Sequence, residues 1–253
     1  MRLSLGRRVA LGVVVATAAV CAVVFASATK AATSVHHGSR IASARDHRLT
    51  NSTSSNWSGY AVTGSRYTSV SASWVQPAVD CSVTPTGWSS FWVGLDGDTT
   101  NTVEQTGSEA DCSSGRAVYS AWYEMYPKYP VNYSNTVKAG DQFSASVTTD
   151  GRGAFSLTLT DTTEGWSHTA NARLKSAKLG SAEVIAEAPS SSGGVLPLAD
   201  FGTANFSAAK ANGTSFANLS GRDAINMVSG GTTKASTGSI SSSGGFSVTW
   251  KHS

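Results

Sequence analysis

Carboxylate and amide side chains are the groups in this sequence that could carry out chemistry. Those that lie in or beside runs of aromatic or small residues are Asp96, Gln105, Glu109, Glu124, Glu183 and Glu187. Taken singly, each acid is expected to be a structural group with hydrogen-bond partners, because a buried carboxylate without them is costly. Taken with Trp92 and Trp122, the set predicts one polar, aromatic-lined concave face. Such a face favours carboxylate-centred acid–base catalysis or carbohydrate binding.

Other chemistries find little support in the sequence. A Ser-His-Asp triad would have to use His168, and no Gly-x-Ser-x-Gly turn precedes a helix. The glycines are scattered and form no phosphate-binding loop. Asp96-Gly97-Asp98 lacks the rest of a calcium loop and is interpreted as a turn. Cysteines without nearby histidines do not make a zinc site, so we expect neither a metal nor a cofactor.

A strand, a polar turn and a returning strand are predicted in residues 92–107, which contain two of these polar groups. Val93 and Leu95 alternate with other residues in the period of two that is typical of a strand. The turn is a run of Gly, Asp, Asn and small hydroxyl residues. This hairpin is expected to bury Val93 and Leu95 and to display Asp96 and Gln105. The Gln105 amide then needs either a structural hydrogen bond or a substrate.

The remaining chain from residue 56 predicts an all-β sandwich in a single domain. Short runs of Val, Tyr, Trp, Phe and Thr alternate with Gly, Ser, Asn and Asp clusters, and no convincing amphipathic helix occurs. The further strands are expected at 56–62, 67–75, 116–126, 142–149, 154–160, 166–173, 181–188, 203–208, 224–228 and 244–250. On one of them, Trp122 and Glu124 share a side. On another, Glu183, Ile185 and Glu187 share a side.

The N-terminal 54 residues are expected to lie outside this domain. Residues 1–32 combine a basic start, an apolar run and small residues, which is typical of a secretory signal peptide, and a lone membrane anchor is the alternative. Residues 33–54 are polar and are interpreted as a disordered leader or a short propeptide. The domain therefore spans 55–253 and is expected to be extracellular. In that compartment Cys81 and Cys112 are expected to form a disulfide rather than stay free thiols.

The charge of the body argues against an anionic partner. Six of the 19 Lys and Arg residues precede Asp46, and none of the 16 Asp and Glu residues does. The overall value of +3 therefore comes from the N-terminal segment, and the body is near −3. We expect no nucleic-acid partner and no stable membrane association after processing. Nothing in the sequence indicates oligomerisation, so a monomer is expected.

Six short motifs stand in a fixed order along the chain: Asn56–Tyr60, Trp92–Asp98, Gln105–Gly107, Ala121–Pro127, Ala182–Glu187 and Leu198–Gly202. In this order, and with similar gaps, they resemble the glutamic peptidases, also called eqolisins. The resemblance covers residues 56 to about 208 most clearly. It implies a secreted acid endopeptidase acting on polypeptides, on a sandwich of two strongly bent antiparallel sheets.

The resemblance also implies roles for single residues. The family's catalytic pair matches Gln105 and Glu187, with Glu183 as the second choice for the acid. Its supporting network matches Asp96, Trp122 and Glu124, with Glu109 and Glu183 nearby, and its substrate cleft matches Trp57 and Trp92. The sequence departs from the family where Glu104 replaces an apolar residue, where Glu109 replaces an Asp and where Val184 replaces an aromatic residue.

The chemistry of this pair follows from its groups. A carboxylate can still be ionised at acid pH, whereas an imidazole would be protonated. Glu187 would take a proton from the attacking water and then pass it to the leaving nitrogen, while Gln105 would donate to the oxyanion. The alternative is a β-glycanase, or a carbohydrate-binding module, on a similar sandwich that uses Glu124 and Glu187 with Trp92 and Trp122 as sugar platforms.

Overall fold

The computed structural model describes residue 1, residues 35–38, residues 40–41 and residues 51–253. The chain divides into two units, residues 1–32 and residues 33–253. The expected signal peptide and much of the expected leader lie outside the described residues. Among those that are described, no helix has the length and apolarity that crossing a membrane would need.

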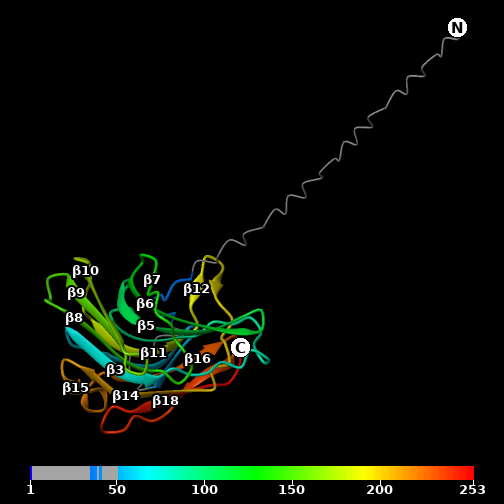
Figure 1. The fold of residues 1–253 in the computed structure, drawn as a ribbon. Coiled ribbons are helices and arrows are strands. Elements are labelled where there is room, and N and C mark those ends of the chain that lie inside the picture. Colours follow the sequence, from blue (N-terminus) through cyan, green and yellow to red (C-terminus); the bar gives the residue numbers. More distant parts are fainter. Residues whose placement is uncertain (2–34, 39, 42–50) are drawn as a thin grey trace. The chain divides into compact units, whose positions relative to one another are not determined.

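The described residues of the second unit form strands and one short 3₁₀ turn (Figure 1). In chain order the elements are β1 (Asn51–Ser54), β2 (Trp57–Thr63), β3 (Ser69–Val75), β4 (Ser90–Leu95), β5 (Val103–Ser113), β6 (Arg116–Tyr126), β7 (Val131–Asn132), β8 (Gln142–Thr149), β9 (Ala154–Asp161), β10 (Trp166–Arg173), β11 (Ser181–Glu187), β12 (Ser190–Ser191), β13 (Gly194–Val195), β14 (Thr203–Ala211), β15 (Thr214–Ser215), η1 (Phe216–Asn218), β16 (Arg222–Ser229), β17 (Thr232–Thr237) and β18 (Phe246–Trp250).

Apart from β12 and β13, which pair only with each other, the strands make a two-layered sandwich from one hydrogen-bonded path. The path runs β10-β9-β8-β3-β14-β18-β17-β16-β2-β11-β4-β5-β6-β7 and does not close into a barrel. Neighbours on it are antiparallel, and β1 joins β16 in parallel at its side. The path folds back on itself, so that β8 and β9 pack across β4 and β5, and β3 packs across β11. The predicted all-β sandwich is confirmed (Figure 1).

The main core lies between the two layers. Its largest fully buried side chains include Phe91, Phe143, Leu157 and Leu159, which come from both layers. Val93 and Leu95 belong to this core, as the alternation predicted. Burying such side chains supplies the main driving force for folding, at roughly 25 cal/mol per Å² of apolar surface.

A smaller apolar cluster covers the opposite face of the layer that contains β2, β11, β4, β5 and β6. Its members are Trp57, Ala61, Trp92, Val103, Trp122, Ile185 and Ile225, with Tyr126 beside them. Successive side chains of a strand point to opposite faces. The residues that alternate with the main core therefore build this second face, which carries the candidate site.

The predicted strands agree with the structure in position and differ in extent. Residues 116–126 and 166–173 are strands over the predicted range. The strand predicted to end at residue 107 continues to Ser113, because a polar stretch there still pairs along the whole of β6. The prediction missed β17, whose Thr, Lys and Ser residues lack an apolar alternation. It also placed residues 51–54 in the leader, although they form β1.

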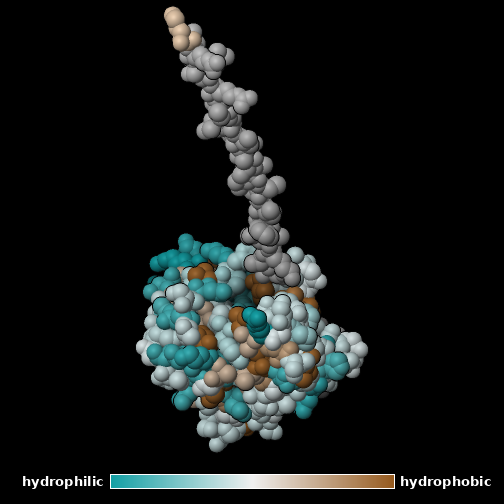
Figure 2. All heavy atoms as spheres, turned by 45° about the vertical axis from the view of Figure 1, so that its right-hand side comes forward, coloured by the Kyte–Doolittle hydropathy of each residue, from teal (hydrophilic) through white to brown (hydrophobic). Residues whose placement is uncertain are grey.

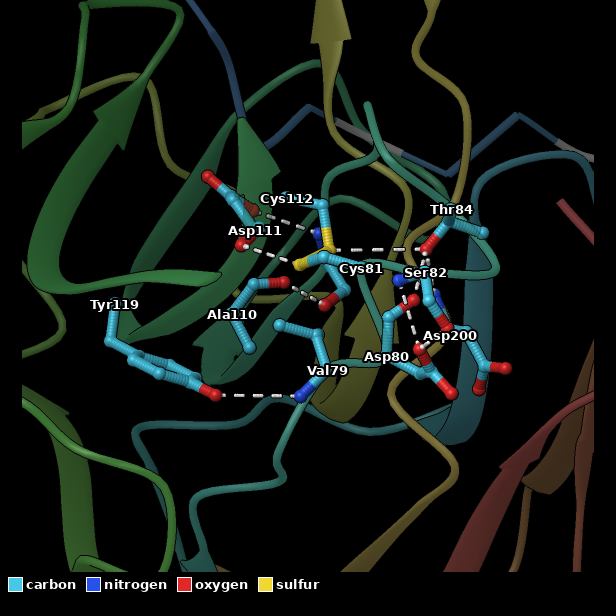
Figure 3. The surroundings of a disulfide bond; sticks show 11 residues. Val79, Asp80, Cys81, Ser82, Thr84, Ala110, Asp111, Cys112, Tyr119 and Asp200 are labelled. Atoms are coloured by element: carbon cyan, nitrogen blue, oxygen red, sulfur yellow. Dashed lines mark hydrogen bonds between the residues drawn. A yellow bond between two sulfur atoms is a disulfide. The ribbon is translucent and has the colours of Figure 1, made fainter. Parts of the chain in front are cut away.

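A disulfide joins the end of β5 to the loop between β3 and β4 (Figure 3). Cys81 and Cys112 are bonded, with Cα atoms 5.4 Å apart, so the predicted pairing is confirmed. The Thr84 hydroxyl donates to the sulfur of Cys112, and the backbone N–H of Val79 donates to the Tyr119 hydroxyl. These contacts fix the 79–84 loop against the two long strands that carry part of the site.

The described surface mixes polar and apolar residues. Figure 2 shows one face, on which apolar residues lie scattered among hydrophilic ones. Among the described residues of the second unit, the exposed large apolar side chains are, apart from Ile41, Val75, Val83, Val118, Tyr129, Val131 and Val195. Some exposed apolar side chains are normal for a folded protein.

Candidate active site

Strand register brings the expected polar residues onto the second face in parallel rows. One row contains Glu183, Gly94, Gln105 and Glu124, which lie opposite one another on β11, β4, β5 and β6. The next row contains Ile185, Trp92, Gly107 and Trp122. The third contains Trp57, Glu187, Ser90, Glu109 and Ser120. Residues opposite each other in an antiparallel pair share a face, so these side chains meet above one curved surface.

Two glycines make room for the aromatic rings of this face. A Cβ on Gly107 would lie 2.2 Å from the carbonyl oxygen of Phe91 and 2.6 Å from the Cβ of Trp92. A Cβ on Gly94 would lie 2.9 Å from the Trp92 ring and 3.2 Å from the Cβ of Gln105. All four distances are shorter than ordinary van der Waals contact. The backbone of β4 at Phe91 and Trp92, the Trp92 ring and the Gln105 side chain therefore occupy space that only glycine leaves free.

Gln105 is fully buried, and Glu124 fixes one end of its amide. Its Nε2 donates to Glu124 Oε2 at 3.3 Å and to the backbone carbonyl oxygen of His37 by a short contact. No described group hydrogen-bonds its Oε1. The amide thus presents its donor side to a peptide carbonyl, as an oxyanion donor must.

Glu187 is also fully buried and is held by donors on both oxygens. Its Oε2 accepts from Trp92 Nε1 at 2.9 Å. Its Oε1 accepts from the backbone N–H of Gly38 at 3.1 Å and from Asn56 Nδ2 at 3.4 Å. The indole orients the carboxylate, and the second oxygen faces the chain that crosses the site.

The chain that crosses the site is part of the expected leader. The backbone of His36 pairs with Ser190 through N–H···O distances of 2.7 and 2.8 Å. The N–H of Arg40 donates to the carbonyl of Gly97 at 3.1 Å, and its guanidinium bonds Asp98 and Asp223. Between these anchors, the peptide bond from His37 to Gly38 lies on Gln105 and Glu187. A polar segment without periodicity gave no sequence signal for this placement.

The ring of His37 is buried beside Trp122 and Glu187. It stacks on Trp122 with ring centroids 3.7 Å apart and planes 4° apart. Its Nδ1 lies 3.1 Å from Ser90 Oγ and 3.9 Å from Glu187 Oε2, while its Nε2 lies 3.3 Å from Glu109 Oε1. His37 is 1% exposed. Neither His37 nor Ser90 was predicted from the sequence to lie in the site.

Trp57 and His36 border the same stretch of chain. Trp57 Nε1 donates to the carbonyl of Gly38 at 3.1 Å, and its ring meets that of Trp92 edge-on at 5.0 Å. His36 Nδ1 lies 3.0 Å from Glu124 Oε1, and the ring of His36 stacks on Tyr129. Trp57 and Trp92 thus lie together beside residues 36–38, and their role in a substrate cleft stays a prediction.

Two residues of the expected supporting network make no hydrogen bond to Gln105 or Glu187. The Asp96 carboxylate accepts the backbone N–H groups of residues 178, 179 and 180 at 2.7, 2.8 and 2.8 Å, and so holds that loop rather than Gln105. Glu183 shares the face with Gln105 but lies opposite Ala61, next to Asp98. Neither of its oxygens has a described hydrogen-bond partner.

Burial controls the ionisation of the site's acids. It raises the pKa of Glu124 to about 9, although hydrogen bonds from the His37 backbone and from Gln105 act to lower this pKa. Burial and the charge of Glu124 raise the pKa of Glu187 well above its ordinary value. The pKa of Glu109 is lowered, since the hydrogen bond and charge of His37 outweigh its burial. Within the described chain, no three His, Cys, Asp or Glu side chains are grouped as a metal site requires.

Comparison with known proteins identifies the family. The sequence pattern of the peptidase A4 family matches residues 55–250. The chain belongs to the peptidase A4 family. The resemblance to the glutamic peptidases, or eqolisins, is thereby confirmed.

Curated relatives and solved structures agree with this assignment. Aspergillopepsin-2 of Aspergillus niger is 32% identical over an alignment of 181 residues, gaps included, and the alignment covers 62% of this chain and 64% of that protein. Scytalidopepsin B of Scytalidium lignicola is 37% identical over 113 residues, which are 44% of this chain and 42% of that protein. The match therefore spans less than two thirds of the length of either relative.

A crystal structure of scytalido-glutamic peptidase with a transition state analog inhibitor matches with a TM-score of 0.67 at 26% identity, covering 78% of this chain and 98% of that chain. The crystal structure of aspergilloglutamic peptidase from Aspergillus niger matches with a TM-score of 0.56 at 28% identity, covering 65% of this chain and 99% of that chain.

Proposed function

We propose that this member of the peptidase A4 family is a secreted acid endopeptidase that hydrolyses polypeptides with Gln105 and Glu187. The observation that carries the proposal is the position of one peptide bond. The carbonyl oxygen of His37 accepts from Gln105 Nε2, and the N–H of Gly38, in the same peptide bond, donates to Glu187 Oε1 at 3.1 Å. An amide and an acid placed on the two ends of one peptide bond are what its hydrolysis requires.

The reaction begins with the attack of water on the carbonyl carbon. Glu187 as carboxylate takes a proton from the water, and Gln105 donates to the oxyanion that develops on the carbonyl oxygen. Protonated Glu187 then gives its proton to the leaving nitrogen. Burial raises the pKa of Glu187, which makes the ionised form a stronger base while it reduces the ionised fraction in acid.

The surrounding groups hold the dyad in place. Glu124 binds Gln105, and Trp92 binds Glu187, so both functional groups keep their direction without substrate contacts. Asp96 acts at a distance by fixing the loop that leads into β11, the strand of Glu187. Secretion is supported by the basic, apolar and small-residue pattern of residues 1–32 and by the Cys81–Cys112 disulfide.

The decisive experiment is incubation with a denatured protein substrate at pH 3 to 4. Glu187→Gln and Gln105→Ala are compared with matched surface controls, Glu164→Gln and Gln142→Ala. Fragment release by the parent chain and the controls is expected, with a loss of roughly 10²–10³ or more in the two site variants. Intact substrate, together with release of sugar from a glycan, would contradict the proposal and favour a glycanase that uses Glu124 and Glu187.

A further inference from the structure

Asn56 begins the first of the six motifs in the sequence, and the proposed reaction gives it no role. The residue directly precedes β2 and is fully buried. Its backbone carbonyl accepts the N–H of Ala188 at 2.8 Å, so it extends the pairing of β2 with β11 by one residue beyond Glu187. Its Nδ2 donates to Glu187 Oε1 at 3.4 Å. Asn56 therefore contacts both the proposed base and the residue that follows this base.

The orientation of the Asn56 amide follows from its other partners. The backbone N–H of Ile41 can only donate, and it lies 2.8 Å from Oδ1. The Ser54 hydroxyl donates to the same Oδ1 at 2.8 Å. With the oxygen at that end of the amide, the NH₂ group is at the end that faces Glu187, and a flipped amide would place two oxygens against each other there. Asn56 is therefore a donor to the carboxylate.

Ser54 supports this amide from the end of β1. The parallel pairing of β1 with β16 fixes its position, with Ser54 opposite Met227. Its hydroxyl oxygen also accepts the N–H groups of Asn56 and Trp57 at 3.3 and 3.2 Å. Ser54 is fully buried, so water does not compete for these bonds. The hydroxyl thus ties the amide to the backbone that begins β2.

The two oxygens of Glu187 are held by different parts of the chain. Trp92 Nε1 donates to Oε2 from within the domain. The N–H of Gly38 donates to Oε1 from the expected leader. Asn56 donates to the same Oε1 from the domain itself, so its bond does not depend on the leader. The indole and the amide together bind the carboxylate at both oxygens, and two such bonds fix its rotation.

We propose that Asn56 is a positioning residue for the general base: its amide holds the Glu187 carboxylate in the direction that reaches the water and the leaving nitrogen, and Ser54 fixes the amide. The proposal rests on the proposed function, in which Glu187 is the base. A donor on Oε1 also favours the ionised carboxylate, which is the form that takes a proton from water. Without this donor, the carboxylate can rotate away and binds a proton more readily.

The first test compares the kinetics of Asn56→Ala and the parent enzyme with one defined peptide. The peptide ends three residues after the scissile bond, so it cannot take the place of Ile41 at Oδ1. We expect kcat to fall roughly 10–100-fold while KM stays within a few-fold, because the amide directs the base and does not bind this peptide.

The matched control is Asn226→Ala, which removes an amide that accepts the N–H of Thr237 at 2.8 Å and should keep the parental kcat. Circular dichroism verifies the fold of each variant. A parental kcat in Asn56→Ala, or an equal loss of kcat in both variants, would overturn the proposal.

The second test follows the ionisation of Glu187 without the use of activity. The Nε1–H of Trp92 bonds Oε2 of the same carboxylate, so its ¹H–¹⁵N NMR signal reports the titration of Glu187. In Asn56→Ala the midpoint should rise by about one pH unit, since a hydrogen bond to the charged form is lost. Among the described residues, the titratable groups that act on Glu187 are Glu124 and His37, and the variant keeps both. Glu187→Gln should abolish the transition and so assigns it, and an unchanged midpoint in Asn56→Ala would overturn the proposal.

The third test determines whether Ser54 acts through Asn56. Ser54→Ala should lower kcat, but by less than Asn56→Ala does. The double variant should match Asn56→Ala alone within about a factor of two, because the hydroxyl then has no amide to orient. Losses that multiply in the double variant would overturn the role of Ser54.

These outcomes separate this proposal from the proposed function. If the parent chain digests denatured protein and Asn56→Ala changes neither kcat nor the NMR midpoint, only the positioning role is wrong. If the parent chain digests nothing, the proposed function fails, and the NMR midpoint still decides whether Asn56 holds the Glu187 carboxylate.

Discussion

Glu104 offers a prediction that concerns folding rather than catalysis. It lies on β5 next to Gln105 but points to the other face, opposite Leu95 and Met125 and toward the main core. It is fully buried, and neither of its oxygens has a described hydrogen-bond partner. Burial, and then the charge of Asp96, raise its pKa from the ordinary 4.5 to about 8, and the nearby Thr102 hydroxyl acts in the opposite direction.

The sign of the effect follows from proton linkage. A carboxyl whose pKa is raised on folding binds more protons in the folded chain than in the unfolded chain. Well below pH 4.5 Glu104 is protonated in both the folded and the unfolded chain, so its ionisation does not change the free energy of unfolding. The protein loses stability as the pH rises from 4.5 toward 8. Between pH 4 and pH 7 the loss from this residue amounts to about 3 kcal/mol of unfolding free energy.

Glu104→Gln removes the ionisation and keeps the shape. We expect the variant to equal the parent within about 1 kcal/mol at pH 4 and to exceed it by about 3 kcal/mol at pH 7. Urea unfolding monitored by tryptophan fluorescence at pH 4, 5, 6 and 7 measures the free energy of unfolding of the variant and of the parent at each pH. The Glu187→Gln background prevents digestion during the measurement.

A matched surface substitution controls for the loss of one negative charge. Glu164→Gln breaks an ion pair with Lys138, whose side chain is 61% exposed, and should change stability by less than about 1 kcal/mol at every pH. Parallel curves for Glu104→Gln and the parent would refute the reasoning, since they would show that Glu104 ionises in the folded protein as easily as in the unfolded one.

Three further predictions concern the framework of the site, and urea unfolding measures all of them. Replacing Cys81 and Cys112 by serine together should cost about 3 to 4 kcal/mol, because the bond closes a loop with a sequence separation of 31; no loss would contradict this. Gly107→Ala should cost more than about 3 kcal/mol, since its Cβ would overlap the Phe91 carbonyl, and a stable variant would show that the strands can separate there. Asp96→Asn should cost about 2 to 4 kcal/mol, because one oxygen cannot serve the three N–H groups of residues 178–180, and parental stability would refute its role in that loop.

Alternation along single strands predicted much of the site. Trp122 and Glu124 share one side of β6, and Glu183, Ile185 and Glu187 share one side of β11, as their spacing required. The parity of a strand follows from its sequence because its side chains alternate. The sequence of one strand does not determine which strands become its neighbours, because pairing depends on the whole core. That Gln105 lies opposite Glu124 on the neighbouring strand was therefore seen only in the structure.

Other parts of the site carried no local signal. His37 and Gly38 lie in a polar segment with neither apolar periodicity nor turn chemistry, so composition alone indicated a leader without a defined place. The resemblance to the glutamic peptidases predicted Asp96 in the network that supports Gln105. In the structure Asp96 directly follows the end of β4 and has a positive φ of 66°. Its carboxylate accepts hydrogen bonds from the backbone of residues 178–180 instead.

The most direct test of the central claim is the effect of Gln105→Ala on the kinetics of the leader-free enzyme with one defined peptide in acid. A donor to the developing oxyanion acts mainly in the transition state, so kcat should fall roughly 10²–10³-fold while KM changes less than a few-fold. An unchanged kcat with a raised KM would show that Gln105 only binds peptides and would contradict the account.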